Sequence, residues 1–396
     1  TAIKLWSKDS KVVLNQMVEA YTIGNDYILD MELIQFDVQG SMAHAKMLKK
    51  IGILSEMELQ TLLIGLQEIL ESWNSKAFVL NQEHEDVHSA IEFYLTEKYG
   101  DVGKKIHTGR SRNDQILVTL RLYSKAKLKE IVQLVKAAII TLNKQSEKFA
   151  GIKMPGYTHM QRAMPSSVGM WLGSYAESME DDLVFIETIQ KIIDQNPLGS
   201  AASFGVVGLG LDRELTTKEM GFAKVQKNPM YCALSRGKFE NLILQGLSQV
   251  VFDLSKLASD LMLFTTKEFG FFDLPDEFKT GSSIMPQKKN FDVLELIRAN
   301  VSVFYAQQYQ IQEIIKNLPS GYNRDFQMTK EPFIKGLQIV QNMLDISNLI
   351  LNHLIVNEKK LSSACSKELY ATDEVYKLVK KGGNFRDAYR KIGNMM

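Results

Sequence analysis

Apolar residues recur every three or four positions over long stretches of this chain, a spacing that is typical of amphipathic helices. The clearest stretch, residues 115–150, contains neither glycine nor proline. Its mostly apolar stripe consists of Leu117, Leu120, Ser124, Leu128, Ile131, Val135, Ala138 and Leu142. The pattern predicts one continuous helix of about ten turns.

Three further runs have the same character. They cover residues 168–193, 239–264 and 287–318, and the last is bracketed by Pro286 and Pro319. Period-two alternation is rare and short βαβ spacing is absent, so we predict an all-α fold. The helices exceed the usual average of about 11–12 residues. Such lengths favour a long central bundle whose outer apolar positions pack against other subunits.

Charge and hydropathy exclude several classes of protein. The 396 residues contain 47 lysines and arginines against 46 acids, so no basic field exists to hold nucleic acid or an anionic membrane. No apolar run reaches 18 residues, and lysines interrupt the apolar positions of residues 1–14. Cys232 and Cys365 lie far apart without CxxC spacing, which argues against a disulfide framework and a thiolate metal site. We expect a soluble cytoplasmic protein.

One polar segment, HTGRSRNDQ, stands at the start of the longest helical run. Ser111 followed by Asp114 is a capping-box pattern, and the free amides of a helix N-terminus favour an anion. Arg110, Arg112 and Asn113 add donors that suit a carboxylate or a phosphate. A capped surface helix with solvated arginines is the alternative.

A second segment, PGYTHMQRAMP, is a proline-bounded connection that contains Thr158 and His159. A loop histidine titrates near neutral pH and can transfer protons. An ordinary surface histidine is the alternative reading.

The third segment is TGSSIMPQKKNF. Glycine and serines around Ser282 predict a mobile loop that closes over a ligand, and Pro286 suits the first position of a helix. Lys288 and Lys289 then place positive charge near that helix start, where an anion would be needed to balance it. On such a helix Glu295 shares a face with Lys288. A basic, serine-capped surface helix is the alternative.

Two other polar segments offer weaker signals. GYNRDFQMTKE presents Tyr322, Gln327 and Lys330, either as ligand contacts or as a turn and a solvated helix end. EHEDVHSAIE presents Asp86 and His88, but spacing indicates no third ligand for a metal.

Taken together, the segments resemble the argininosuccinate lyase branch of the fumarase/aspartase superfamily. GSSIMPQKKN is the superfamily signature in that branch's spelling, and HTGRSRNDQ, GYTHMQRAMP, EDVHSAIE, NPLGSAA and YNRDFQMTKE accompany it in the family's order. The resemblance implies an all-α, three-domain subunit: residues 1–106, a central long-helix bundle over 107–350, and a C-terminal helical domain over 351–396 that lacks part of the usual last region. It also implies a homotetramer with a 20-helix core, in which each active site is shared between three subunits.

The reaction that the resemblance implies is the reversible β-elimination of argininosuccinate to arginine and fumarate, without metal or organic cofactor. Loss of a proton beside a carboxylate creates an aci-carboxylate, which fixed cations and amides must stabilise. Lys288 and Asn290 match that role. Ser282 matches the base and His159 the acid, oriented by Glu295 of a neighbouring chain, although which of the two donates the proton and which accepts it stays open.

The remaining correspondences concern binding. Ser111, Arg112, Asn113 and Thr158 match contacts to the fumaryl carboxylates, Tyr322, Gln327 and Lys330 match contacts to the rest of the substrate, and His88 matches a helper. Two positions depart from the family pattern, because Phe291 replaces a proline and Asp26 replaces a serine. The role of Asp26 and that of Arg236 are left open.

Other functions fit these segments less well. Adenylosuccinate lyase also releases fumarate, but the QKKN and TGRSRND spellings disfavour it and no nucleotide phosphate site is evident. A lens-crystallin-like structural protein would not need Ser282, His159, Lys288 and Glu295 all intact. A nucleic-acid site at Lys288 and Lys289 would need interleaved aromatic residues, which the segment lacks.

Overall fold

The structure is a computed structural model that describes residues 15–396. Residues 1–14, whose lysine-interrupted pattern contributed to the expectation of a soluble cytoplasmic protein, lie outside the described range. The chain divides into two compact units. Unit 1 comprises residues 1–130, 187–245 and 306–337, and unit 2 comprises residues 131–186, 246–305 and 338–396. Each unit is described by itself.

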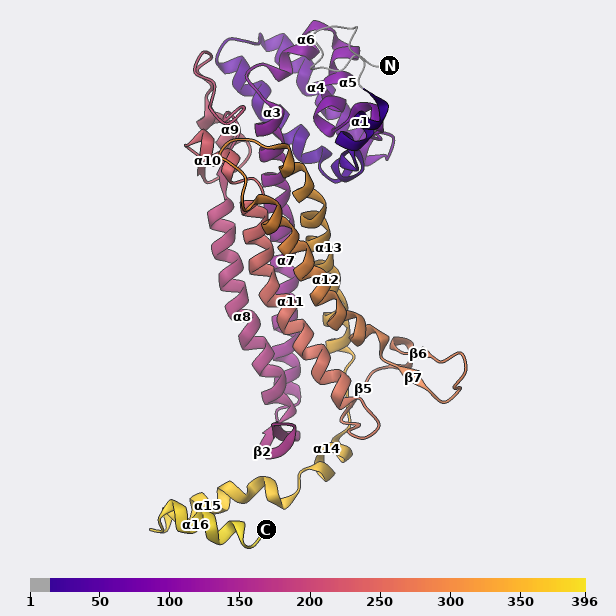
Figure 1. Ribbon diagram of the computed structural model, residues 1–396, viewed down its shortest axis with the longest axis vertical. Helices are drawn as coiled ribbons and strands as arrows, with labels where there is room; N and C mark the ends of the chain where they lie inside the picture. Colours follow the sequence, from indigo (N-terminus) through magenta and orange to yellow (C-terminus); the bar gives the residue numbers. More distant parts are fainter. Residues whose placement is uncertain (1–14) are drawn as a thin grey trace. The chain divides into compact units, whose positions relative to one another are not determined.

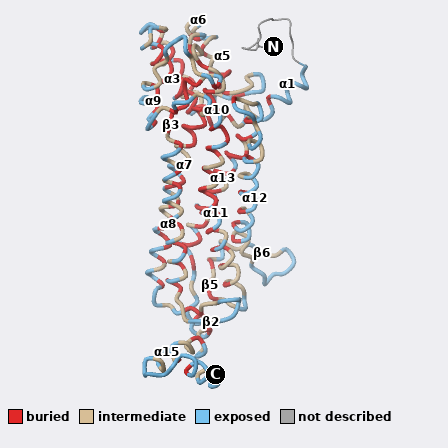
Figure 2. Tube along the Cα trace, turned by 60° about the vertical axis from the view of Figure 1, so that its left-hand side comes forward, coloured by how far each residue is buried: buried red, intermediate tan, exposed pale blue. Residues whose placement is uncertain are grey.

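Five long helices dominate both units and confirm the predicted all-α class (Figure 1). They are α7 (Arg112–Lys148), α8 (Val168–Ile193), α11 (Lys238–Phe264), α12 (Asp292–Ile315) and α13 (Lys330–Asn352). The runs predicted over 115–150, 168–193 and 239–264 correspond to α7, α8 and α11. Figure 2 shows buried positions alternating with exposed ones along these helices, as an amphipathic spacing requires.

The start of α12 differs from the prediction. The helix begins at Asp292, so Pro286 is not its first residue and Lys288 does not share a helical face with Glu295. Instead, β6 (Thr280–Gly281) pairs antiparallel with β7 (Lys289–Asn290) and closes residues 282–288 into a loop. The pairing takes the backbone groups that a helix over residues 287–291 would need.

Unit 1 contains a helical core around α3 (Ile34–Lys50), α4 (Glu56–Asn74) and α5 (Val87–Tyr99). Apolar side chains such as Ile34, Leu62 and Ile91 are fully buried there. Side chains cap the helix starts: Ser55 and Glu58 form a capping box on α4, and Asp86 caps α5. These caps fix where each helix begins.

Smaller elements complete unit 1. They are α1 (Gln16–Ile23), α2 (Asp26–Leu29), α6 (Asp101–Lys104), α9 (Arg213–Glu219), α10 (Pro229–Leu234), the 3₁₀ helices Asp30–Glu32, Gln82–His84, Lys105–His107 and Arg324–Thr329, and the parallel pair of β3 (Gln195–Asn196) with β4 (Lys224–Val225).

In unit 2 the segments of the five long helices lie side by side (Figures 1 and 2). An aromatic cluster packs at their ends, where Trp171 stacks on Phe272 with ring centroids 5.0 Å apart. The other elements are β1 (Lys153–Thr158), β2 (Gln161–Ser167), β5 (Phe272–Asp273), β8 (Ile355–Val356), α14 (Glu358–Ala364), α15 (Ala371–Lys380), α16 (Phe385–Gly393) and the 3₁₀ helices Asp276–Phe278 and Lys367–Tyr370. The pairs β1–β2 and β5–β8 are both antiparallel.

Across residues 15–396, no helix combines the length and the apolar character that crossing a lipid bilayer demands.

Two carboxyl groups meet inside unit 2, Asp182 of α8 and Asp253 of α11. Burial, followed by the negative charges of Asp253 and Asp181, raises the pKa of Asp182 to about 7. Burial also raises the pKa of Asp253. The folded chain therefore holds a proton at Asp182 that the unfolded chain releases near pH 4.

This pair predicts a pH-dependent stability. A raised acid pKa in the folded state contributes stability that is present below pH 4 and is lost as the pH rises through 7. Asp182→Asn should therefore raise the thermal unfolding midpoint relative to wild type at pH 8 and change it little below pH 4. Glu177→Gln, an exposed change on α8, is the control. An equal shift at both pH values for Asp182→Asn would contradict the assignment.

Candidate functional site

Unit 1 encloses a polar cavity of about 140 Å³. Its wall includes six residues that the family resemblance predicts to contact substrate: His88, Arg112, Asn113, Tyr322, Gln327 and Lys330. Asp26, Asp30, Asp86, Ile116, Arg236 and Arg324 complete the wall. Segments that are distant in sequence, such as those of Asp26 and Lys330, thus converge on one small, strongly charged space.

Lys330, the first residue of α13, is a buried cation on the wall of this cavity. Its Nζ lies 2.6 Å from Asp30 Oδ1 and 3.2 Å from Asp26 Oδ1, and its side chain is only 3% exposed. Burial disfavours the charged ammonium, but the two carboxylates outweigh it and raise the pKa of Lys330. Asp30 also accepts a hydrogen bond from the backbone of Val87 at 3.0 Å, which links the pair to the start of α5.

Asp26 is the residue that replaces the family's serine. Burial raises the pKa of its carboxyl group, and Lys330 only partly offsets that effect. Asp26 and Asp30 are four residues apart, a spacing that places both on one helical face and could have identified Asp30 from the sequence. Sequence analysis did not single out Asp30.

His88 and Asp37 form a buried pair below the cavity. The Nδ1 atom of His88 contacts Asp37 Oδ2, and Gln115 and Thr119 also donate hydrogen bonds to Asp37. Burial opposes both charges, yet the Asp37 carboxylate raises the pKa of His88, and His88 in turn lowers the pKa of Asp37. The imidazolium is therefore favoured. Its Nε2 atom is buried without a hydrogen-bond partner within residues 15–396.

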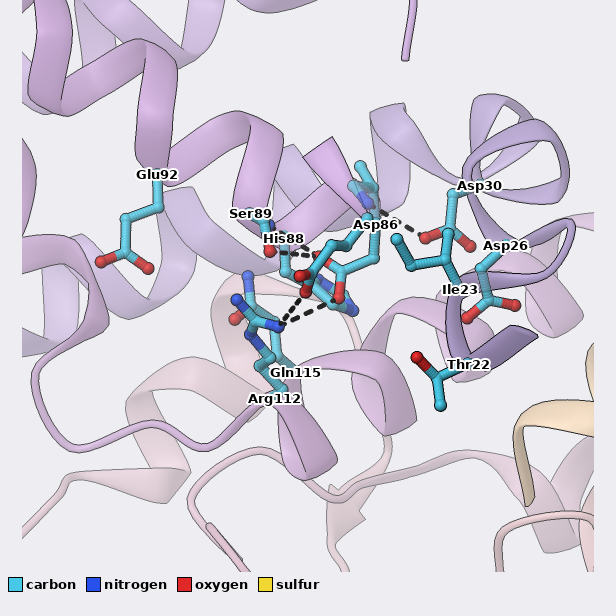
Figure 3. Close-up of polar contacts among 12 residues, drawn as sticks. Thr22, Ile23, Asp26, Asp30, Asp86, His88, Ser89, Glu92, Arg112 and Gln115 are labelled. Carbon is cyan, nitrogen blue, oxygen red and sulfur yellow. Dashed lines mark hydrogen bonds and ion pairs between the residues drawn. The ribbon is translucent and has the colours of Figure 1, made fainter. Parts of the chain in front are cut away.

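The start of α7 supplies donors to the same cavity, and its cap follows the predicted pattern. Asp114 Oδ1 accepts from the Ser111 backbone at 2.9 Å, and Ser111 Oγ accepts from the Asn113 backbone at 3.2 Å. The guanidinium of Arg112 lies 3.3 Å from Glu85 Oε2 and 3.6 Å from Asp86 Oδ2. Figure 3 shows Arg112 and Asp86 close together. These acids hold Arg112 at the cavity wall without burying it.

Gln327 takes part in a backbone contact. Its amide donates to the carbonyls of Thr22 and Ile23 at 3.0 and 3.2 Å, and Arg324 donates to Thr22 at 2.9 Å. In this structure these two side chains hold the end of α1. Arg236, whose role the sequence left open, is buried and donates to the carbonyl of Phe326 at 3.3 Å.

Unit 2 contains the lysine-rich loop that precedes α12. Lys288, Asn290 and Glu295 line a cavity of about 1140 Å³. The structure distinguishes the two adjacent lysines, because Lys289 Nζ lies 2.5 Å from Asp276 Oδ2. Within residues 15–396, the ammonium of Lys288 has neither an ion pair nor a hydrogen bond. Of the two adjacent lysines, Lys288 is therefore the one whose charge is available to an incoming anion.

Ser282 lies in the same loop but does not line that cavity. Its Oγ accepts hydrogen bonds from the backbone N–H groups of Met285 at 3.0 Å and Ile284 at 3.4 Å. Two such donors stabilise negative charge on the oxygen.

His159 stands at the tip of a β-hairpin, where the sequence predicted only a loop. Thr158 pairs with Gln161, so the turn has two central residues, His159 and Met160, with φ of 51° and 60°. Positive φ at both central positions is the signature of a type I′ turn, which ordinarily selects Asn-Gly. The hairpin therefore carries backbone strain where it presents an exposed histidine.

The predicted site residues are thus divided between the units. Seven belong to unit 1, namely Ser111, Arg112, Asn113, His88, Tyr322, Gln327 and Lys330, and six belong to unit 2, namely Thr158, His159, Ser282, Lys288, Asn290 and Glu295. Six of the unit 1 residues line one cavity, whereas of the site residues described in unit 2 only Lys288, Asn290 and Glu295 share a cavity. In unit 1 His88 and Lys330 are buried and the other five residues are partly exposed, whereas those of unit 2 stand on exposed segments.

Comparison with known proteins agrees with the motifs. A sequence model of the family described as "Lyase" matches residues 11–303. The argininosuccinate lyase of Phocaeicola vulgatus is 45% identical over 99% of this chain and 87% of its own length. The argininosuccinate lyase of Thermotoga neapolitana is 44% identical over 98% of this chain and 97% of its own length.

Solved structures show the same fold at low sequence identity. An EDDS lyase in complex with formate has a TM-score of 0.81 and 23% identity, covering 96% of this chain and 76% of its own. A class II fumarase from Schistosoma mansoni has a TM-score of 0.79 and 15% identity, covering 95% of this chain and 91% of its own.

The buried lysine of the unit 1 cavity yields a stability prediction. Lys330→Met leaves the carboxylates of Asp26 and Asp30 without their cation, and loss of one partner of a buried ion pair costs about 3–5 kcal/mol. Denaturant unfolding should show a loss of that order. Lys335→Met is the matched control on the same helix, because its ion pair with Glu331 is exposed and worth only about 0.3–0.5 kcal/mol. Equal losses for the two variants would contradict the analysis.

Proposed function

The chain belongs to the argininosuccinate lyase family, and on that premise we propose that it catalyses the reversible β-elimination of argininosuccinate to L-arginine and fumarate. The observation that carries the proposal is similarity to argininosuccinate lyases over nearly the whole chain, combined with intact Ser282, His159, Lys288 and Glu295. The place of such a reaction in metabolism is arginine biosynthesis.

We assign the proton abstraction to Ser282. A serine hydroxyl is a weak base unless its alkoxide is stabilised. The amides of Ile284 and Met285 supply that stabilisation, because they already donate to Ser282 Oγ. Closure of the loop over the substrate would exclude water and strengthen these contacts.

Lys288 and Asn290 then hold the carboxylate that gains charge as the carbon loses its proton. The aci-carboxylate is doubly charged, so a cation without a competing acid is the group that its formation requires. Lys288 meets this condition and Lys289, paired with Asp276, does not.

His159 is the proposed acid towards the departing guanidino nitrogen, with Glu295 of a neighbouring chain as its orienting partner. The exposed hairpin tip fits a residue that must reach into another subunit's site. The opposite order, with His159 as base and Ser282 as acid, uses the same atoms.

The cavity of unit 1 binds the substrate in this proposal. Arg112, Asn113 and Ser111, with Thr158, contact the fumaryl carboxylates, since a guanidinium and helix-terminal amides suit that group. Protonated His88 adds a donor at Nε2. Tyr322, Gln327 and Lys330 contact the remainder of the substrate, which requires Gln327 to exchange its bonds to Thr22 and Ile23 for substrate.

The assembly we propose is a homotetramer of three-domain subunits with sites shared between three chains. Large apolar side chains stand exposed on α12, at Leu296, Val303, Tyr305 and Tyr309. A helix that buries one apolar stripe and exposes a second needs a further partner. The proposed reaction uses no metal and no organic cofactor, and we place it in the cytoplasm.

His159→Asn tests the acid. Asparagine tolerates positive φ better than most residues, so the hairpin should keep or gain stability. Loss of a general acid should lower kcat by about 10²–10⁴-fold. Fumarate release from argininosuccinate, followed by absorbance, is the measurement. Activity near that of wild type would reject the role, and turnover of adenylosuccinate instead of argininosuccinate by the wild type would reject the proposed function.

The two adjacent lysines form a matched pair for the second test. Lys288→Met should lower kcat by about 10²–10³-fold, the usual effect of removing one donor to a developing oxyanion. Lys289→Met loses only an exposed ion pair and should retain activity within about tenfold. The same assay decides, and a larger loss for Lys289→Met than for Lys288→Met would contradict the assignment.

A further inference from the structure

We propose that Lys279 is a positioning residue that clamps the stem of the 282–288 loop through Phe291, and so holds Ser282 and Lys288 in place for catalysis. The inference rests on the proposed function of those two residues. Lys279 itself lies outside the loop and is assigned no contact with substrate.

The stem is a short ladder between the two arms of the loop. Thr280 pairs with Asn290, and Gly281 pairs with Lys289. The hydroxyl of Thr280 also donates to Asp292 at 2.6 Å. A two-residue ladder of this kind is marginal by itself.

Lys279 and Phe291 occupy the next position of that ladder, immediately outside the last backbone pair. The Nζ atom of Lys279 lies 5.6 Å from the centroid of the Phe291 ring. A cation at that distance is attracted to the ring face, and the attraction grows when the cation is shielded from water. Lys279 is well shielded, because its side chain is 7% exposed. This cross-strand contact thus closes the base of the loop.

The ammonium also ties the stem to the rest of unit 2. It lies 2.7 Å from Asp273 Oδ1 and 3.2 Å from Asp276 Oδ1. Asp273 belongs to β5, which pairs with β8, so the clamp is fixed to an element outside the loop. Burial disfavours the charged lysine, but hydrogen bonds to the two carboxylates outweigh it and raise the pKa of Lys279.

Charge gives the clamp a second role. Asp273 and Lys279 both line the cavity that Lys288 lines. Asp276 is shared by Lys279 and Lys289. With Lys279 in place, these acids are balanced by cations other than Lys288. Without it, the cavity would hold uncompensated negative charge close to the site proposed for a substrate carboxylate.

The contact with Lys279 gives a structural role to Phe291, which stands where the family pattern has a proline. A proline after Asn290 would fix that backbone angle by its ring. Here Phe291 leaves the angle free, and the ring contact with the buried lysine restrains the arm instead.

The test compares Lys279→Met, Lys279→Arg and Phe291→Leu with Lys267→Met, an exposed lysine on the wall of the same cavity. Each is assayed as the full chain for kcat, KM, unfolding midpoint and hydrogen exchange of the amides of residues 281–289. A displaced catalytic group commonly costs up to about 10²-fold in rate. We expect Lys279→Met to lose at least about tenfold in kcat and to show faster amide exchange in the loop. Lys279→Arg should restore the wild-type kcat and the wild-type exchange rate. Phe291→Leu should give values of kcat and exchange between those of wild type and Lys279→Met.

Lys267→Met should have the kcat and the loop amide exchange of the wild type. A kcat within twofold of wild type for Lys279→Met, or unchanged exchange in the loop, would overturn the proposal. The proposal would also be overturned if Lys279→Arg failed to restore kcat or failed to restore slow amide exchange in the loop. If Lys279→Met does not fold, Phe291→Leu decides, because it removes the ring contact and leaves the ion pairs. Exchange is read without turnover, so an inactive wild type would refute the proposed function and leave the clamp measurable.

Discussion

The pairing of Lys330 with Asp30 and Asp26 is the interaction on which the unit 1 site depends. An ammonium that is 3% exposed cannot remain charged without partners. Asp30 binds the lysine and the backbone of Val87 at once, so it joins the start of α13, the start of α5 and the Asp26–Asp30 segment. His88 lies one residue beyond Val87, and its position follows from that junction. Charge pairing thus acts together with the apolar core, of which Val87 is a fully buried member, to bring these residues together.

The long helices were predictable because their sequence signals are local. Spacing of apolar positions in 115–150 and the absence of helix breakers locate α7 without reference to any other part of the chain. The start of α12 was predicted wrongly for the opposite reason. Pro286 suits a helix start, but a cross-strand pairing with residues 280–281 competes for the same backbone, and no local signal reveals that competition. Asp37 was missed likewise, because a single acid in an apolar run acquires meaning only from His88, 51 residues away.

The sequence predicts the geometry of some site residues but not of others. The cap of α7 could be predicted because Ser111 and Asp114 are close in sequence and bond to each other at the start of the helix that they cap. The sequence could not show that Lys289 is paired and Lys288 is not, since the pairing partner, Asp276, lies on a separate segment. The strained turn at His159 and Met160 could not be predicted from the sequence, because neither residue type indicates positive φ. Functional strain of this kind contradicts local propensity, so propensity cannot reveal it.

Solvent exposure separates the two groups of residues and bears on assembly. Lys330 and His88 are buried and paired in unit 1, ready to bind. Lys288, Glu295 and His159 are exposed in unit 2. Proton abstraction by a serine needs a site from which water is excluded, because water would solvate the alkoxide and weaken every fixed charge. The proposed catalytic groups are exposed and therefore require a cover. A second copy of the chain that packs against the apolar side chains of α12 would supply one, and this requirement connects the proposed chemistry with the proposed oligomer.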